Sequence, residues 1–116
     1  MELESILTSM KKLLGIEEEY EHFDADLIMH INSVFMILTQ LGVGPAEGFH
    51  IEDAETTWSE YTGVGSDFEA VYTYMGLKLQ LIFDPPDRAP ITEVKNKLIS
   101  ELEWRLNVAA ESNDSE

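Results

Sequence analysis

The sequence predicts an all-α fold, a small bundle of four main helices with one short helix in a long Gly-rich connecting loop. Apolar residues recur at intervals of three and four along most of the chain, which is the spacing of one face of an α-helix. Glycine and proline gather between these segments, where they end helices. A chain of 116 residues, 44% of them apolar, is expected to form one compact domain, here residues 1–108.

The first two main helices are predicted over residues 3–14 and from Asp24 to about residue 41. Gly15 ends the first helix, whose apolar positions follow helical spacing. Asp24 is expected to cap the N-terminus of the second helix. The apolar stripe of the second helix alternates steps of four and three and consists of Leu27, Ile31, Val34, Leu38 and Leu41.

Residues 42–65 form the long connection, in which one short helix is expected from Ala54 to Tyr61 with Asp53 as its cap. Trp58 and Tyr61 belong to residue types that are enriched where proteins bind each other. Two interpretations stay open for this pair. The side chains either contact a partner or fill a small core beneath the loop.

The third main helix is predicted from Phe68 to Phe83, and Ser66 and Glu69 have the spacing of a capping box at its start. This helix is apolar nearly all round, because a second stripe lies opposite the main one. A helix of this kind must be buried on every side, either in a core or against a partner. We expect the second stripe to form an interface; its residues are Tyr74, Leu77 and Leu81.

The fourth main helix is predicted from Pro90 to Val108. Its core-facing stripe is expected to be Ile91, Val94, Leu98, Leu102 and Leu106. Trp104 lies about 150° from the centre of this stripe at 100° per residue, so we expect it on the outer face, in an interface. Arg105 falls at the edge of the stripe. It either reaches solvent from a buried stem or pairs with Asp84 or Glu101.

The charge balance excludes several functions. The net charge is −16, from 23 acids and seven bases, which argues against a basic footprint on nucleic acid. Solubility is its simplest role, and a surface that repels DNA is the sharper alternative. The chain has no cysteine for a disulfide or a thiolate site. We expect no membrane partner, because no apolar run approaches the length that crosses a bilayer.

Candidate catalytic and metal-binding patterns are weak. Glu19 with His22 and Glu47 with His50 have the Glu-x-x-His spacing of di-iron bundles. Both pairs fall in predicted connections, where this spacing does not aim two side chains at one point. The glycines from 42 to 48 match no phosphate-binding motif. We therefore expect no metal site, no cofactor and no enzymatic activity.

Two segments carry a family resemblance. Residues 74–86 include Phe83-Asp84-Pro85-Pro86, and residues 101–108 read Glu-Leu-Glu-Trp-Arg-Leu-Asn-Val, with Arg105 in fifth place. Together they resemble the C-terminal half of the small head–tail connector (adaptor) proteins of tailed bacteriophages and prophages. The motifs are structural, so the resemblance bears on fold and assembly together.

The resemblance implies a non-catalytic protein that forms a ring of about a dozen subunits under the portal. Such a ring extends the DNA channel, passes DNA as cargo, and carries the next head-completion or tail protein. The implied location is the virion head–tail junction, after assembly in the bacterial cytoplasm. Residues 109–116 are expected to be an acidic disordered tail, which orders on docking to the portal through residues such as Glu111 and Asp114.

Two other functions remain as alternatives. A small acidic regulator, such as a DNA mimic, would use the same charge but would be a monomer or dimer with carboxylates spaced like phosphates. A metal-dependent helical enzyme would require His22 and His50 to bind metal.

Overall fold

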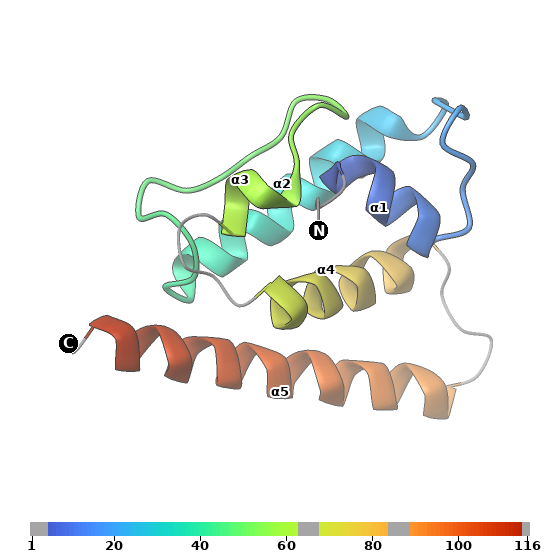
Figure 1. The fold of residues 1–116 in the computed structure, drawn as a ribbon. Coiled ribbons are helices and arrows are strands. Elements are labelled where there is room, and N and C mark those ends of the chain that lie inside the picture. The colour runs from blue at the N-terminus through green and yellow to red at the C-terminus, as the bar shows by residue number, and fades with distance from the viewer. Residues whose placement is uncertain (1–4, 63–67, 84–88, 115–116) are drawn as a thin grey trace.

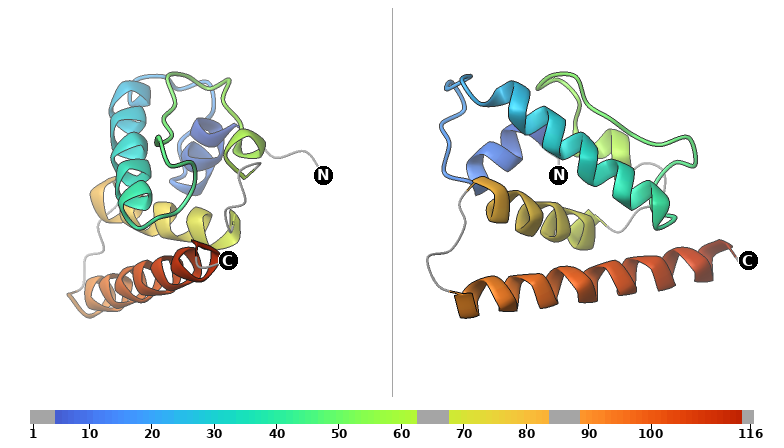
Figure 2. Two further views of the ribbon diagram at one scale, coloured as in Figure 1. Left: turned by 90° about the vertical axis from the view of Figure 1, so that its left-hand side faces the viewer. Right: turned by 180° about the vertical axis from the view of Figure 1, so that it is seen from behind.

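The computed structural model describes residues 5–62, 68–83 and 89–114, and within these ranges the chain is all-α, as predicted. The helices are α1 (Ile6–Leu13), α2 (Asp24–Gln40), α3 (Trp58–Thr62), α4 (Phe68–Phe83) and α5 (Ala89–Asp114). Helices α1, α2 and α3 form one side of the molecule, α4 lies in the middle, and α5 forms the opposite side (Figure 1). The two views in Figure 2 show the same order.

The central position of α4 explains its apolar residues on every side. One side of the helix packs on α2 and the other on α5. Tyr74, from the second stripe, is fully buried, and Leu77 and Leu81 are partly buried against the same core. The expected interface with another molecule therefore does not hold for Tyr74, because α5 of the same chain covers it.

Gly76 lets α1 approach the middle of α4 closely. A Cβ atom at this position would lie 2.7 Å from Cδ1 of Leu13. Glycine inside a helix costs about 1 kcal/mol relative to alanine. The close contact between the two helices gives this glycine a packing role.

A buried lysine holds the connection between α1 and α2. Lys11 donates hydrogen bonds from Nζ to the backbone oxygens of Glu18 (2.9 Å) and Tyr20 (2.6 Å), and its Nζ lies 2.8 Å from Oδ1 of Asp24. Asp24 is the first residue of α2, and Phe23 occupies the N-cap position without a side-chain hydrogen bond. The predicted cap at Asp24 is therefore wrong, because its carboxylate pairs with Lys11 instead.

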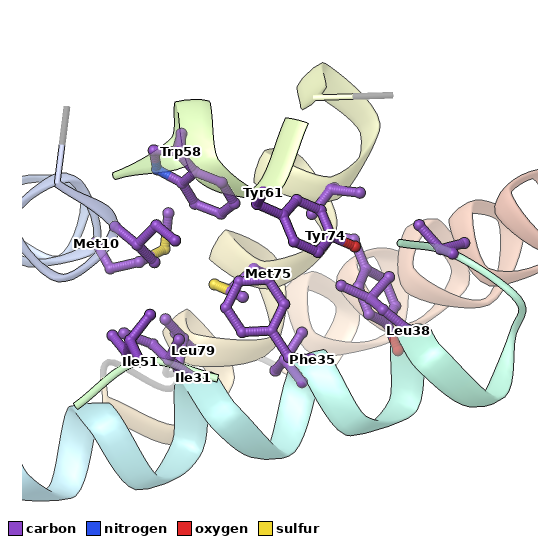
Figure 3. Close-up of a cluster of buried hydrophobic side chains, with 14 of the residues drawn as sticks. Met10, Ile31, Phe35, Leu38, Ile51, Trp58, Tyr61, Tyr74, Met75 and Leu79 are labelled. Carbon is purple, nitrogen blue, oxygen red and sulfur yellow. The ribbon is translucent and has the colours of Figure 1, made fainter. Parts of the chain in front are cut away.

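The loop after α2 is fastened to that helix by one amide side chain. Asn32 donates from Nδ2 to the Ile51 oxygen (2.9 Å) and accepts from the Ile51 nitrogen at Oδ1 (2.8 Å). Beyond this point Trp58 and Tyr61 enter the core beside Phe35 (Figure 3). The loop thus covers an aromatic core shared by α2, α3 and α4.

Helix α3 is shorter than the predicted helix from Ala54 to Tyr61 and begins at Trp58. Asp53 does not cap it. Its Oδ1 accepts from the nitrogen of Glu55 (2.9 Å) in a local turn. The hydrogen bond at the start of α3 comes instead from within the helix: Oε2 of Glu60 accepts from the nitrogen of Thr57, the residue before the helix (2.8 Å).

Helix α5 continues to Asp114, beyond the predicted end at Val108. Two contacts with the end of α2 lie on the C-terminal part of α5. Asn107 donates from Nδ2 to the Leu41 oxygen (3.1 Å), and a Cβ atom at Gly42 would lie 3.2 Å from Cβ of Ala110. The expected disordered tail therefore differs from the structure over residues 109–114, which are helical.

Candidate functional site

The outer face of α5 exposes large apolar side chains along its length. We define this α5 outer face as Ile91, Val94, Leu98, Trp104 and Val108, whose exposed fractions lie between 38% and 65%. All five fall within about 140° of one another around the helix, at 100° per residue. The described part of α4 adds Ile82, near its C-terminus, to the exposed apolar residues. This is an apolar surface that the protomer leaves uncovered.

Hydrogen bonds to α4 and α2 set which side of α5 packs inward. Tyr74 donates from its hydroxyl to Oε2 of Glu103 (2.7 Å), and Lys95 donates from Nζ to Oε1 of Gln80 (3.3 Å). Asn107 adds the bond to the end of α2 described above. Burial first, then the hydrogen bond to Glu103 and its negative charge, raise the pKa of the Tyr74 hydroxyl. These bonds fix the rotation of α5 about its own axis.

The predicted core stripe of α5 is wrong in its first half. Ile91, Val94 and Leu98 are exposed, whereas Leu106 is buried as predicted. Ile99 is also buried, although it was not in the stripe. The hydrogen-bonding side of the helix faces inward together with Ile99 and Leu106, so the first half of the predicted stripe faces outward.

Trp104 lies on the outer face, as predicted, and is the most exposed of the large apolar residues there. The next residue in the sequence, Arg105, pairs with Glu101 at 2.9 Å between Nη2 and Oε1. The pair with Glu101 is thus present, whereas Asp84, the other candidate partner of Arg105, lies outside the described residues. The pair is exposed, so it stabilises the helix by a few tenths of a kcal/mol, about 0.3–0.5.

The ionisable groups of the described residues form no site for metal chemistry. No cluster of three or more His, Asp or Glu side chains there has the geometry to hold a metal ion. His50 lies 3.9 Å from Glu52, and both side chains are largely exposed. In the same ranges, every helix is too short or too polar to span a bilayer.

Comparison with known proteins identifies the family. The model of the phage connector protein family matches residues 6–113, nearly the whole chain. The chain belongs to this family. Nothing among curated proteins or among solved structures matches it.

Membership in the connector family gives the chain a role in the phage particle. It is a connector-type structural protein, and proteins of this kind associate with other head and tail proteins at the head–tail junction. This kind of protein is structural and not enzymatic. The resemblance found in the sequence is confirmed.

The structure places the other predicted interface residues as follows. Trp58 and Tyr61 are buried, which decides between their two interpretations in favour of the core. Trp58 donates from Nε1 to Oγ of Ser9 on α1 (2.7 Å), so its polar atom is satisfied inside the protomer. Glu111 is exposed near the end of α5. Asp114 is the last residue of that helix.

Part of the predicted structural motif lies outside the described residues. Ser66 of the expected capping box and Asp84, Pro85 and Pro86 of the turn fall there. Within the described part, Glu69 is in the first turn of α4. The Phe83 ring meets that of His30 edge to face, with centroids 5.4 Å apart.

Two further exposed apolar residues, Met29 and Met36 on α2, were not predicted as surface residues from the sequence. The signal was present in the same helical pattern. Both residues fall on the side opposite the buried stripe that contains Ile31 and Leu38, at 100° per residue. The spacing that predicts the buried stripe therefore also predicts that these two methionines are exposed.

Proposed function

We propose that this protein is a head–tail connector that assembles as a ring of about a dozen copies beneath the portal. The ring extends the DNA channel and forms the platform for the tail or for the next head-completion protein. Family membership supports the connector role. The observation that carries the assembly step is the uncovered apolar face of α5.

That face has the features of a protein–protein contact. Contiguous apolar patches on a protein surface mark binding sites more often than single exposed side chains do. Tryptophan is enriched among the residues that dominate binding energy, and Trp104 stands within this face. Two charged side chains, Glu101 and Arg105, pair with each other beside it, so contact at this point does not leave either of these two charges unpaired.

The acidic surface fits a channel through which DNA passes. A net charge of −16 disfavours binding to the phosphate backbone. DNA would then be passing cargo for the ring and not a ligand. Glu111 and Asp114, at the far end of α5, remain our candidates for contact with the portal.

Native mass spectrometry tests the proposal on the full chain, alone and mixed with the portal protein of the same phage. We expect a closed ring of one size, either alone or on the portal. Trp104→Ala should weaken assembly about thirtyfold, the effect of a binding hot spot worth about 2 kcal/mol. Circular dichroism should show that the variant keeps its helices.

Tyr20→Ala is the matched control. Tyr20 is also a large exposed aromatic residue, but it lies in the connection between α1 and α2. Its contact with Lys11 uses the backbone oxygen, which the substitution keeps. Assembly should be unchanged. A wild-type monomer or dimer that does not bind the portal would overturn the proposal and favour the acidic regulator.

A further inference from the structure

The exposed side of α2 is a second apolar face. Met29 and Met36 are each more than half exposed and lie seven residues apart, about two turns along the helix. Beside Met36 a groove of about 360 Å³ opens between α2 and the loop that follows it. Its lining includes Asn32, Thr39, Glu47 and Phe49. We call Met29, Met36 and this groove the α2 face.

The two apolar faces differ in charge. No lysine or arginine occurs between residues 13 and 77, so every charged side chain of α2 and of the following loop is acidic apart from histidine. Glu47 and Glu52 are exposed at or near the groove. The α5 outer face, in contrast, is mixed in charge: it has two exposed bases, Lys97 and Arg105, and two exposed acids, Glu93 and Glu101, of which Glu101 pairs with Arg105.

This difference in charge affects which pairs of faces bind favourably. Two α2 faces brought together would oppose acidic groups without a lysine or arginine between them, which is unfavourable. The α5 outer face brings bases and apolar side chains to the same contact. An α5 face against another α5 face would leave the methionines of α2 uncovered. The combination that covers both apolar faces, and that brings the base Lys97 to the acidic α2 face, is α5 against α2.

We propose that the α5 outer face of one copy docks on the α2 face of a second copy of this chain. Helices α2 and α5 belong to opposite sides of the molecule, with α4 between them (Figure 2). A contact between two different faces is heterologous, and its repetition either closes a ring or continues as a filament. The inference rests on the proposed function and assigns the two surfaces that its ring would use.

Disulfide capture tests this contact even where it is weak, because the chain has no cysteine of its own. Leu98→Cys places a thiol on the α5 outer face, and Met36→Cys places one on the α2 face. The two purified variants are mixed under mild oxidation, and the dimers are separated by mass. Glu18→Cys is the control partner, since Glu18 is exposed in the acidic connection between α1 and α2.

We expect the Leu98→Cys and Met36→Cys pair to form mixed dimers at least about tenfold faster than Leu98→Cys with Glu18→Cys, because contact raises the local thiol concentration. Adding Lys97→Glu to the Leu98→Cys chain should slow this reaction, since it places an acid against the acidic α2 face. All variants change exposed residues and should keep the wild-type circular dichroism spectrum.

Two results would overturn the inference. One is a mixed-dimer rate no higher than the control, and the other is faster formation of Leu98→Cys homodimers, which indicates α5 against α5. These outcomes are separate from failure of the proposed function. If a ring forms on the portal without the α5–α2 cross-link, only the inference fails. If the chain cross-links as expected but ignores the portal, only the connector role fails.

Discussion

Replacing Lys11 by methionine tests the role of the buried lysine most directly. Its side chain is only 3% exposed, and its ammonium group serves two backbone oxygens and the Asp24 carboxylate. Methionine fills a similar volume but donates no hydrogen bond. The substitution therefore leaves two backbone carbonyls without their donor and the Asp24 carboxylate without its counter-charge, while it keeps most of the packing.

The structure sets the size of the effect. Removing one partner of a buried ion pair costs about 3–5 kcal/mol, because the other charge stays buried. The Asp24 side chain remains 26% exposed, so water reaches it in part, and the lower end of the range applies. We expect a loss of about 3 kcal/mol. For a chain of this size, that lowers the melting temperature by about 12 °C.

Urea unfolding followed by circular dichroism measures this loss. Lys12→Met is the control, because it removes the same charge from the next position, which is exposed; it should cost no more than about 0.5 kcal/mol. Adding Asp24→Leu to Lys11→Met should recover part of the loss by removing the unpaired carboxylate. Equal stability of the Lys11→Met and Lys12→Met variants would refute the reasoning.

Two further predictions concern α4. Gly76→Ala should change the unfolding free energy by less than about 1 kcal/mol, because the helix gain offsets a small shift of Leu13, whereas Gly76→Val should cost about 2 kcal/mol. Tyr74→Phe should cost about 1.5 kcal/mol at pH 7 by removing the bond to Glu103. The folded pKa of Tyr74 lies above its ordinary value of 10.0, so the unfolded chain loses this proton first. Stability should therefore fall above pH 10 more steeply in the wild type than in Tyr74→Phe. Parallel curves of unfolding free energy against pH for the wild type and Tyr74→Phe would contradict the prediction for Tyr74. Equal stability of Gly76→Ala and Gly76→Val would contradict the prediction for Gly76.

The helical pattern predicted α4 correctly at both ends and required it to be covered on every side. It did not say what covers the second stripe. Tyr74 donates a hydrogen bond to Glu103, 29 positions along the chain. This contact between distant residues shows that α5 covers the second stripe at Tyr74. Periodicity describes one helix at a time, so the same apolar stripe satisfies a neighbouring helix or a neighbouring molecule equally well.

The same limit applies to the rotation of α5. Its apolar stripe was expected to face inward, yet the hydrogen bonds that Lys95 and Asn107 donate and Glu103 accepts turn another side of the helix toward the bundle and leave the first half of the stripe exposed. The spacing of apolar residues carries no information about those hydrogen bonds. The candidate site is therefore only partly visible in the sequence. Trp104 was found because it stands apart from the stripe, while Leu98 was missed because it belongs to it.

The two tryptophans occupy opposite environments, and this separates two signals in one fluorescence experiment. Trp58 is buried beside Phe35, whereas Trp104 is largely exposed on α5. With Trp104→Phe, the remaining emission follows unfolding of the core. With Trp58→Phe, it follows the surroundings of the α5 outer face and shifts to shorter wavelength when a partner covers that face. The chain thus has a built-in reporter for folding and another for assembly.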